Sequence, residues 1–96
     1  MLSREDFMFT IGYDGPIAVV DGQSKKRYGT LSTQALAEKG LFRAAYCSAL
    51  RSGQPEEVDL VIDAYNKASG SSLTRESPLG RLFGVLPVEA QRCKIL

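Results

Sequence analysis

Residues 7–20 read FMFTIGYDGPIAVV, and this stretch decides the fold class. Apolar side chains recur at every second position of its first half, a period that favours a β-strand. The residues expected on one side of that strand are Phe7, Phe9, Ile11 and Tyr13. Asp14-Gly15 predicts a tight hairpin turn, because glycine readily adopts the positive φ angles of such a turn. Ile17–Val20 is then the returning strand, with Pro16 tolerated at its edge.

From Leu31 the apolar period lengthens to about 3.6, which is typical of helices. The recurring residues are Leu36, Ala37, Leu41, Ala44, Ala45, Ala49 and Leu50. Ser32 or Thr33 can cap the first helix, and Gly40 divides the segment into two helices. Pro55 predicts the start of another helix, which Gly70 ends. A short fourth helix is expected from Ser77-Pro78 to Gly84.

Two further segments leave alternatives open. Residues 23–28 are either a third strand or a loop after the second Asp-Gly, and residues 86–96 are either an edge strand or a flexible tail. The order of elements predicts an α+β fold with an antiparallel sheet, in which the N-terminal hairpin packs against three or four helices. A hairpin alone is marginal in water, so the helices or a second copy of the chain must cover its apolar residues. Those residues are Phe7, Phe9, Ile11, Ile17 and Val19.

Length and composition restrict the class of protein. The chain has 96 residues, of which 44% are hydrophobic and 24% charged, with a net charge of +1. We expect one globular domain over residues 1–96, without a global field that would draw it to a polyanion or a membrane. No apolar stretch approaches the ~20 residues that span a bilayer. Cys47 and Cys93 are too few for a disulfide framework, so a cytoplasmic protein with reduced thiols is expected.

The sequence offers little for catalysis. It has no histidine, which removes the usual general base and the commonest transition-metal ligand. Two carboxylate pairs, Asp14 with Asp21 and Asp59 with Asp63, could hold a cation or share a proton, but turn formation and an exposed helix face are the simpler explanations. We therefore predict that the protein is not an enzyme and has no cofactor and no metal ion.

Two features point toward nucleic acids. The run Lys25, Lys26, Arg27 and Tyr28 could bind phosphates and stack a base, or it could protect a sheet edge from aggregation. Residues 31–40 resemble the first helix and turn of bacterial helix-turn-helix proteins, although Gly40 comes one residue early and Lys39 replaces an apolar residue. The resemblance implies DNA binding by a degenerate helix-turn-helix segment over residues 31–51. The second helix has few base-reading side chains besides Arg43 and Arg51, which favours a core helix instead.

The aromatic content favours a different function. Aromatic side chains are enriched at protein interfaces. The candidate interface residues are Tyr13, Phe42, Tyr46 and Phe83. We therefore predict a small, non-catalytic cytosolic interaction or regulatory protein that binds a protein partner or itself as a homodimer, with a small nucleic-acid-binding protein as the alternative.

Overall fold

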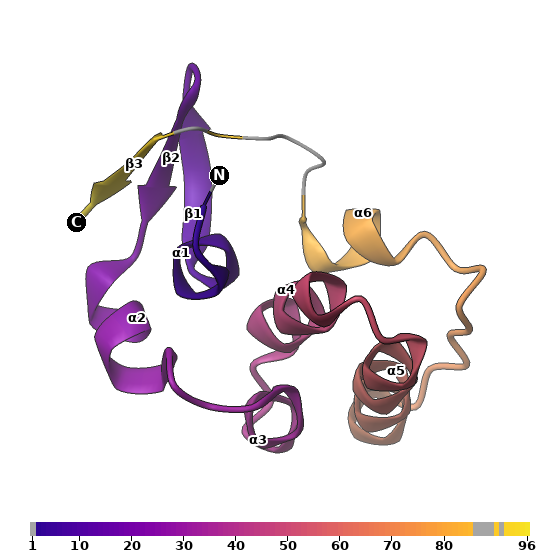
Figure 1. Ribbon diagram of the computed structural model, residues 1–96. Coiled ribbons are helices and arrows are strands. Elements are labelled where there is room, and N and C mark those ends of the chain that lie inside the picture. Colours follow the sequence, from indigo (N-terminus) through magenta and orange to yellow (C-terminus); the bar gives the residue numbers. More distant parts are fainter. Residues whose placement is uncertain (1, 86–89, 91) are drawn as a thin grey trace. The chain divides into compact units, whose positions relative to one another are not determined.

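The structure is a computed structural model that describes residues 2–85, 90 and 92–96. The chain forms two compact units. We call Met1–Thr30 with Pro87–Leu96 the sheet unit, and Leu31–Leu86 the helical unit. Figure 1 shows both strands and helices, so the predicted α+β class is confirmed. The expectation of a single domain over residues 1–96 stays a prediction.

The sheet unit contains a three-stranded sheet in the order β1-β2-β3 (Figure 1). β1, Thr10–Asp14, pairs antiparallel with β2, Ile17–Val20, across a turn in which Gly15 has a φ of 59°. β3, Arg92–Ile95, pairs parallel with β2. The predicted hairpin and the predicted tail strand are confirmed. The sheet is mixed, however, whereas an antiparallel sheet was expected, and residues 86–89 and 91 of the tail lie outside the described residues.

A helix replaces the beginning of the predicted first strand. α1 spans Arg4–Met8, so Phe7 is helical and Phe9 is the C-cap. The N-cap is Ser3, whose Oγ accepts the backbone N–H of Asp6 at 3.1 Å. Side-chain capping satisfies donors that a helix end would otherwise leave unpaired. This local bonding prevails over the alternation of aromatic residues, and the prediction of a strand from Phe7 was wrong.

A second helix follows the hairpin. α2 spans Gly22–Tyr28, so the prediction of a strand or loop over residues 23–28 was wrong. Its N-cap is Asp21, whose Oδ1 accepts the backbone N–H of Ser24 at 3.2 Å and whose Oδ2 accepts the Ser24 hydroxyl at 2.7 Å. Aspartate before glycine favours turns and helix N-caps alike, and here it caps a helix.

A β-bulge in β1 determines which residues share a face of the sheet. The Cα partners are Thr10 with Val20, Gly12 with Val19, Tyr13 with Ala18, and Asp14 with Ile17. Ile11 is the additional residue and is 55% exposed. Because a bulge inserts one residue into one strand, it reverses the alternation of faces beyond it. Tyr13 therefore lies on the face of the buried Ala18 and Val20. Ile17 and Val19 lie on the other face and are half-buried, so the helices do not cover them completely, and cover by a second copy stays a prediction.

The helical unit contains four described helices. They are α3 Thr33–Glu38, α4 Phe42–Ser52, α5 Pro55–Ser69 and α6 Leu79–Phe83. α4 is central, since it packs against α3, α5 and α6. Ser32 caps α3, as predicted, through a bond from the Ala35 N–H at 3.1 Å.

Glycines in the left-handed conformation separate these helices. Gly40, Gly53, Gly70 and Gly84 all have positive φ angles between 69° and 78°. Residues with a side chain rarely adopt this conformation, which explains why the predicted helix boundaries at Gly40, Gly70 and Gly84 are confirmed. α6 begins at Leu79, with Pro78 as its N-cap rather than its first residue.

An aromatic cluster fills the space between α4, α5 and α6. The ring centroids lie 5.2 Å apart for Phe42 and Tyr65, 5.3 Å for Tyr65 and Phe83, and 5.1 Å for Tyr46 and Phe83. The first two pairs meet edge to face, an arrangement in which the positive ring edge meets the negative ring face. Tyr46 and Phe83 are buried. These rings therefore stabilise the helical unit from within.

A chain of polar side chains joins three helices of this unit. The Thr33 hydroxyl donates to a carboxylate oxygen of Glu57, and it lies 2.7 Å from the Ser48 hydroxyl. Thr33 has a single hydroxyl proton, so Ser48 must be the donor in the second bond. Thr33 and Ser48 are both buried. These hydrogen bonds therefore give partners to two hydroxyl groups whose burial without a partner would cost free energy.

Candidate functional site

One face of the sheet carries exposed charged residues, and we call it the open face. Strand register places two rows of residues across it. The rows are Asp14, Ile17 and Arg92, and Gly12, Val19 and Lys94. The charged residues of both rows are exposed, while Ile17 and Val19 are half-buried. A Cβ added to Gly12 would have no atom within 4 Å, so the face is also unobstructed at that point.

The charges of the open face are arranged asymmetrically. Asp14 lies on β1, at one edge of the sheet, whereas Arg92 and Lys94 lie on β3, at the other edge. Among the described residues, none of these three takes part in an ion pair. Apolar β-branched residues of β2 run between the two edges. The face therefore combines an apolar strip with unpaired charges of opposite sign on its two sides.

The opposite face, which we call the closed face, is covered along β2 and exposed at Ile95 of β3. Ala18 and Val20 are completely buried there. Cys93 also lies on this face, and its thiol donates to Asp6 Oδ2 of α1 at 3.5 Å. Lys25 of α2 lies 2.7 Å from Asp6 Oδ1. These contacts hold β3, α1 and α2 together.

Asp6 and Lys25 stabilise each other in their charged forms. Burial alone would raise the pKa of Asp6, but hydrogen bonds from Lys25 and Ser3 and the charge of Lys25 outweigh burial, and the pKa is lowered. The hydrogen bond to Asp6 raises the pKa of Lys25. Burial and the neighbouring Asp6 charge raise the pKa of Cys93, so its thiol stays protonated. A protonated thiol is a poor nucleophile.

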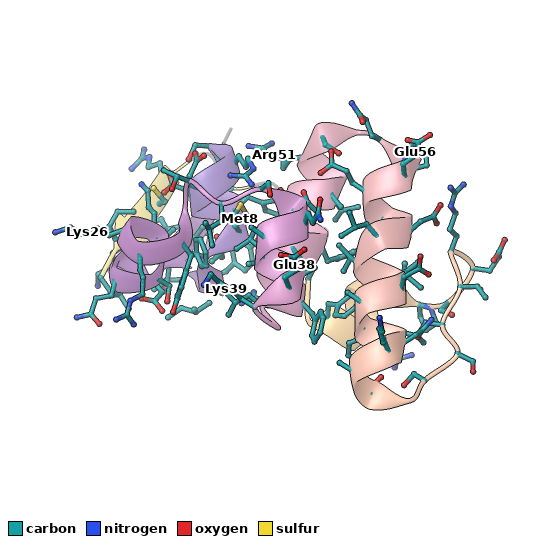
Figure 2. All side chains as sticks on the ribbon, turned by 90° about the horizontal axis from the view of Figure 1, so that it is seen from below. Met8, Lys26, Glu38, Lys39, Arg51 and Glu56 are labelled. Carbon is teal, nitrogen blue, oxygen red and sulfur yellow. The ribbon has the colours of Figure 1, made fainter. Side chains whose placement is uncertain are left out.

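The predicted basic run lies on α2. Lys25 is engaged by Asp6, whereas Lys26 and Arg27 are exposed, and Figure 2 shows Lys26 pointing away from the helix. The Arg27 guanidinium lies 5.8 Å from the centre of the Tyr28 ring, which itself lies 6.5 Å from the ring of Phe9. Because the run is helical, the interpretation that it protects a sheet edge was wrong. The exposed charges on the edge strand β3 are Arg92 and Lys94, which sequence reasoning did not single out.

The four candidate interface residues belong to two different units. Phe42, Tyr46 and Phe83 belong to the aromatic cluster of the helical unit. Tyr13 lies half-buried on the closed face of the sheet. The proposed interface role of these four residues stays a prediction.

The helix-turn-helix-like segment forms two helices, α3 and α4, joined by a turn at Gly40. In α4 the residues from Ala44 to Ala49 are all buried, which leaves few side chains able to enter a DNA groove. Arg43 and Arg51 are half-buried. The geometry agrees with a core helix.

Three further groups with chemical capacity are bonded or buried within the protein. Asp21 caps α2, and its bonds to Ser24 lower the pKa of its carboxyl. Asp59 accepts two hydrogen bonds from Arg75, which lower its pKa as well. Burial raises the pKa of Cys47 to about 11. Within residues 2–85, 90 and 92–96, no group of three or more acidic or cysteine side chains is placed to hold a metal ion.

Comparisons with known proteins add no family. Models of protein families, curated proteins and solved structures gave no match. In the part of the chain that the structure describes, every helix is too short or too polar to cross a bilayer.

The open face could have been found in part from sequence. The alternation of Arg92, Cys93, Lys94 and Ile95 is visible in the printed chain and indicates that Arg92 and Lys94 share one face. Their alignment with Asp14, Ile17 and Val19 depends on the parallel register of β3 and on the bulge at Ile11. Neither feature has a local sequence signal.

Proposed function

We propose that the protein is a non-catalytic interaction module that binds a protein partner through the open face of its sheet. The observation that carries this proposal is the apolar strip of Ile17 and Val19 between unpaired charges. Binding surfaces commonly have an apolar centre and a polar rim. Burial of the centre contributes binding free energy, and complementary charges at the rim determine which partner binds.

The absence of catalysis is part of the same proposal. Both thiols have raised pKa values, and the carboxylates Asp6, Asp21 and Asp59 are each engaged in a cap or an ion pair. A catalytic base needs a free pair of electrons and a pKa near the working pH. Cysteines in a cytoplasmic protein are reduced, and Cys47 and Cys93 are both free, which supports a cytoplasmic location.

Site-specific photo-crosslinking tests the proposal. A benzophenone amino acid at Val19 is expected to form adducts with a protein in the producing cell, because position 19 lies at the centre of the binding surface. The matched control carries the same group at Lys67, an exposed position on α5. Adducts that are abundant at position 19, scarce at position 67 and lost when Ile17→Asp is added would support the proposal. Equal labelling at both positions would contradict it.

Nucleic-acid binding is the second candidate function. It is favoured by Lys26 and Arg27, which are exposed on α2 and have no ion pair among the described residues. Binding through two such cations weakens as the salt concentration rises, because counterions released from the nucleic acid gain less entropy at higher salt. Binding of DNA or RNA at low salt that is lost in the variant K26A/R27A would support this function. No binding by the unaltered protein at low salt would exclude it.

A further inference from the structure

The charge pattern of the open face is complementary to itself. Acidic Asp14 occupies the β1 edge of one row, and basic Arg92 occupies the β3 edge of the same row. A second copy of the face that presents its β3 above the first copy's β1 would therefore bring opposite charges together. In such an arrangement the apolar residues of β2 would lie above their own counterparts.

We propose that the open face binds the open face of a second copy of this chain, with the two β2 strands stacked along a common two-fold axis. This inference rests on the proposed function and names the partner. An axis parallel to β2 exchanges the two edges of the sheet, so Asp14 of each copy faces Arg92 of the other. The same operation places Lys94 above Gly12, where a Cβ would meet nothing within 4 Å and a long side chain has room.

Electrostatics selects this axis over the other in-plane one. A two-fold axis perpendicular to the strands would place β3 above β3, and Arg92 of one copy would then lie near Lys94 of the other. Like charges in contact across an interface cost binding energy and disfavour that register. The parallel axis instead forms two equivalent pairs between Asp14 and Arg92, as a closed two-fold interface requires.

The size of the face sets the strength of the dimer. Strands about 4.8 Å apart with a rise of about 3.3 Å per residue give a face of roughly 200 Å² in projection. Stable complexes bury about 800 Å² on each partner. The dimer is therefore weak, with a dissociation constant expected between about 0.1 and 1 mM, and it forms at high local concentration.

Disulfide trapping tests the axis directly, even for a weak dimer. Val19 lies on the axis, so V19C in a C93S background is expected to form a covalent dimer under mild oxidation. K67C in the same background is the control, because Lys67 is exposed on α5 and belongs to the helical unit rather than the sheet. Trapping at least about tenfold faster for V19C than for K67C would support the stacked strands. Equal rates would overturn them.

A charge exchange tests the pairing of Asp14 with Arg92. D14R and R92D each place like charges opposite one another, and each is expected to weaken self-association about tenfold in sedimentation equilibrium. The double variant D14R/R92D restores opposite charges and is expected to recover the affinity. A double variant no better than the singles would overturn the pairing. Circular dichroism of all three variants establishes that they are folded.

The outcomes also separate this inference from the proposed function. A protein that stays monomeric up to about 1 mM, but whose position 19 crosslinks to a different protein, overturns the second copy and leaves the interaction module intact. A monomer whose position 19 labels no protein overturns both. Rapid disulfide trapping of V19C, together with recovered affinity in D14R/R92D, supports both the interaction module and the second copy as its partner.

Discussion

The two units of this protein differ in where their side chains find partners. In the helical unit, aromatic rings contact one another between α4, α5 and α6, and buried hydroxyls are hydrogen-bonded across helices. In the sheet unit, one face is covered and the other leaves Asp14, Arg92 and Lys94 without ion pairs among the described residues. The difference indicates that the aromatic rings between α4, α5 and α6 stabilise the fold, whereas binding through the charged strand residues is our proposal.

The largest expected effect concerns the aromatic cluster. Phe83→Ala removes a buried ring that contacts both Tyr46 and Tyr65 and should lower the free energy of unfolding by about 3–5 kcal/mol. Leu82→Ala, on the same helix but 46% exposed, is the control and should cost much less. Urea unfolding measures both. Similar losses for the two variants would contradict the assignment of Phe83 to the core.

The second prediction compares the two faces of β2. Val20 is completely buried, so Val20→Thr places a hydroxyl on the closed face and should cost about 1–3 kcal/mol. Val19→Thr makes the same chemical change on the open face and should alter stability by less than about 0.5 kcal/mol. Thermal and urea unfolding would show the difference. A larger loss at position 19 than at position 20 would reverse the assignment of the faces.

The third prediction concerns the contacts that join α1, α2 and β3. The pKa of Asp6 is lowered from its usual 3.8, so its pairing with Lys25 stabilises the fold above that pH and is lost as pH falls through the lowered value. Lys25→Met should therefore destabilise the sheet unit near neutral pH and flatten the acid dependence of stability. Lys26→Met, one position along α2, should leave the stability near neutral pH and its acid dependence unchanged. A pH profile identical in the two variants would exclude a stabilising role for the pair.

The smallest expected effect concerns Gly12. A Cβ at this position meets no atom within 4 Å and the φ of Gly12 is not positive, so Gly12→Ala should raise the free energy of unfolding by roughly 0.4–1 kcal/mol, because alanine restricts the unfolded chain. Gly22→Ala is the contrasting variant, because a Cβ there would collide with the Leu96 carbonyl oxygen beside β3. Gly22→Ala should be the less stable of the two in urea. Equal stability would indicate that β3 moves away from α2 without cost.

The sequence predicted the fold best where signals are local. The turn at Gly15, the caps and glycine ends of the helices, and Pro55 at a helix start all depend on the backbone preferences of a few neighbouring residues. The errors at Phe7 and at residues 23–28 came from periodicity that capping by Ser3 and Asp21 overrode. The alignment of Asp14 with Arg92 across the open face has no local signal, because a strand from the end of the chain and a bulge bring these residues into register.

The most direct test of the open face as a self-binding surface is a dilution series followed by ¹⁵N–¹H NMR. Between about 1 mM and 20 µM, we predict concentration-dependent amide shifts that are largest at Gly12, Val19 and Lys94, while the amides of α4 and α5 stay unchanged. Shifts confined to the helical unit, or no shifts over this range, would contradict self-association through the open face.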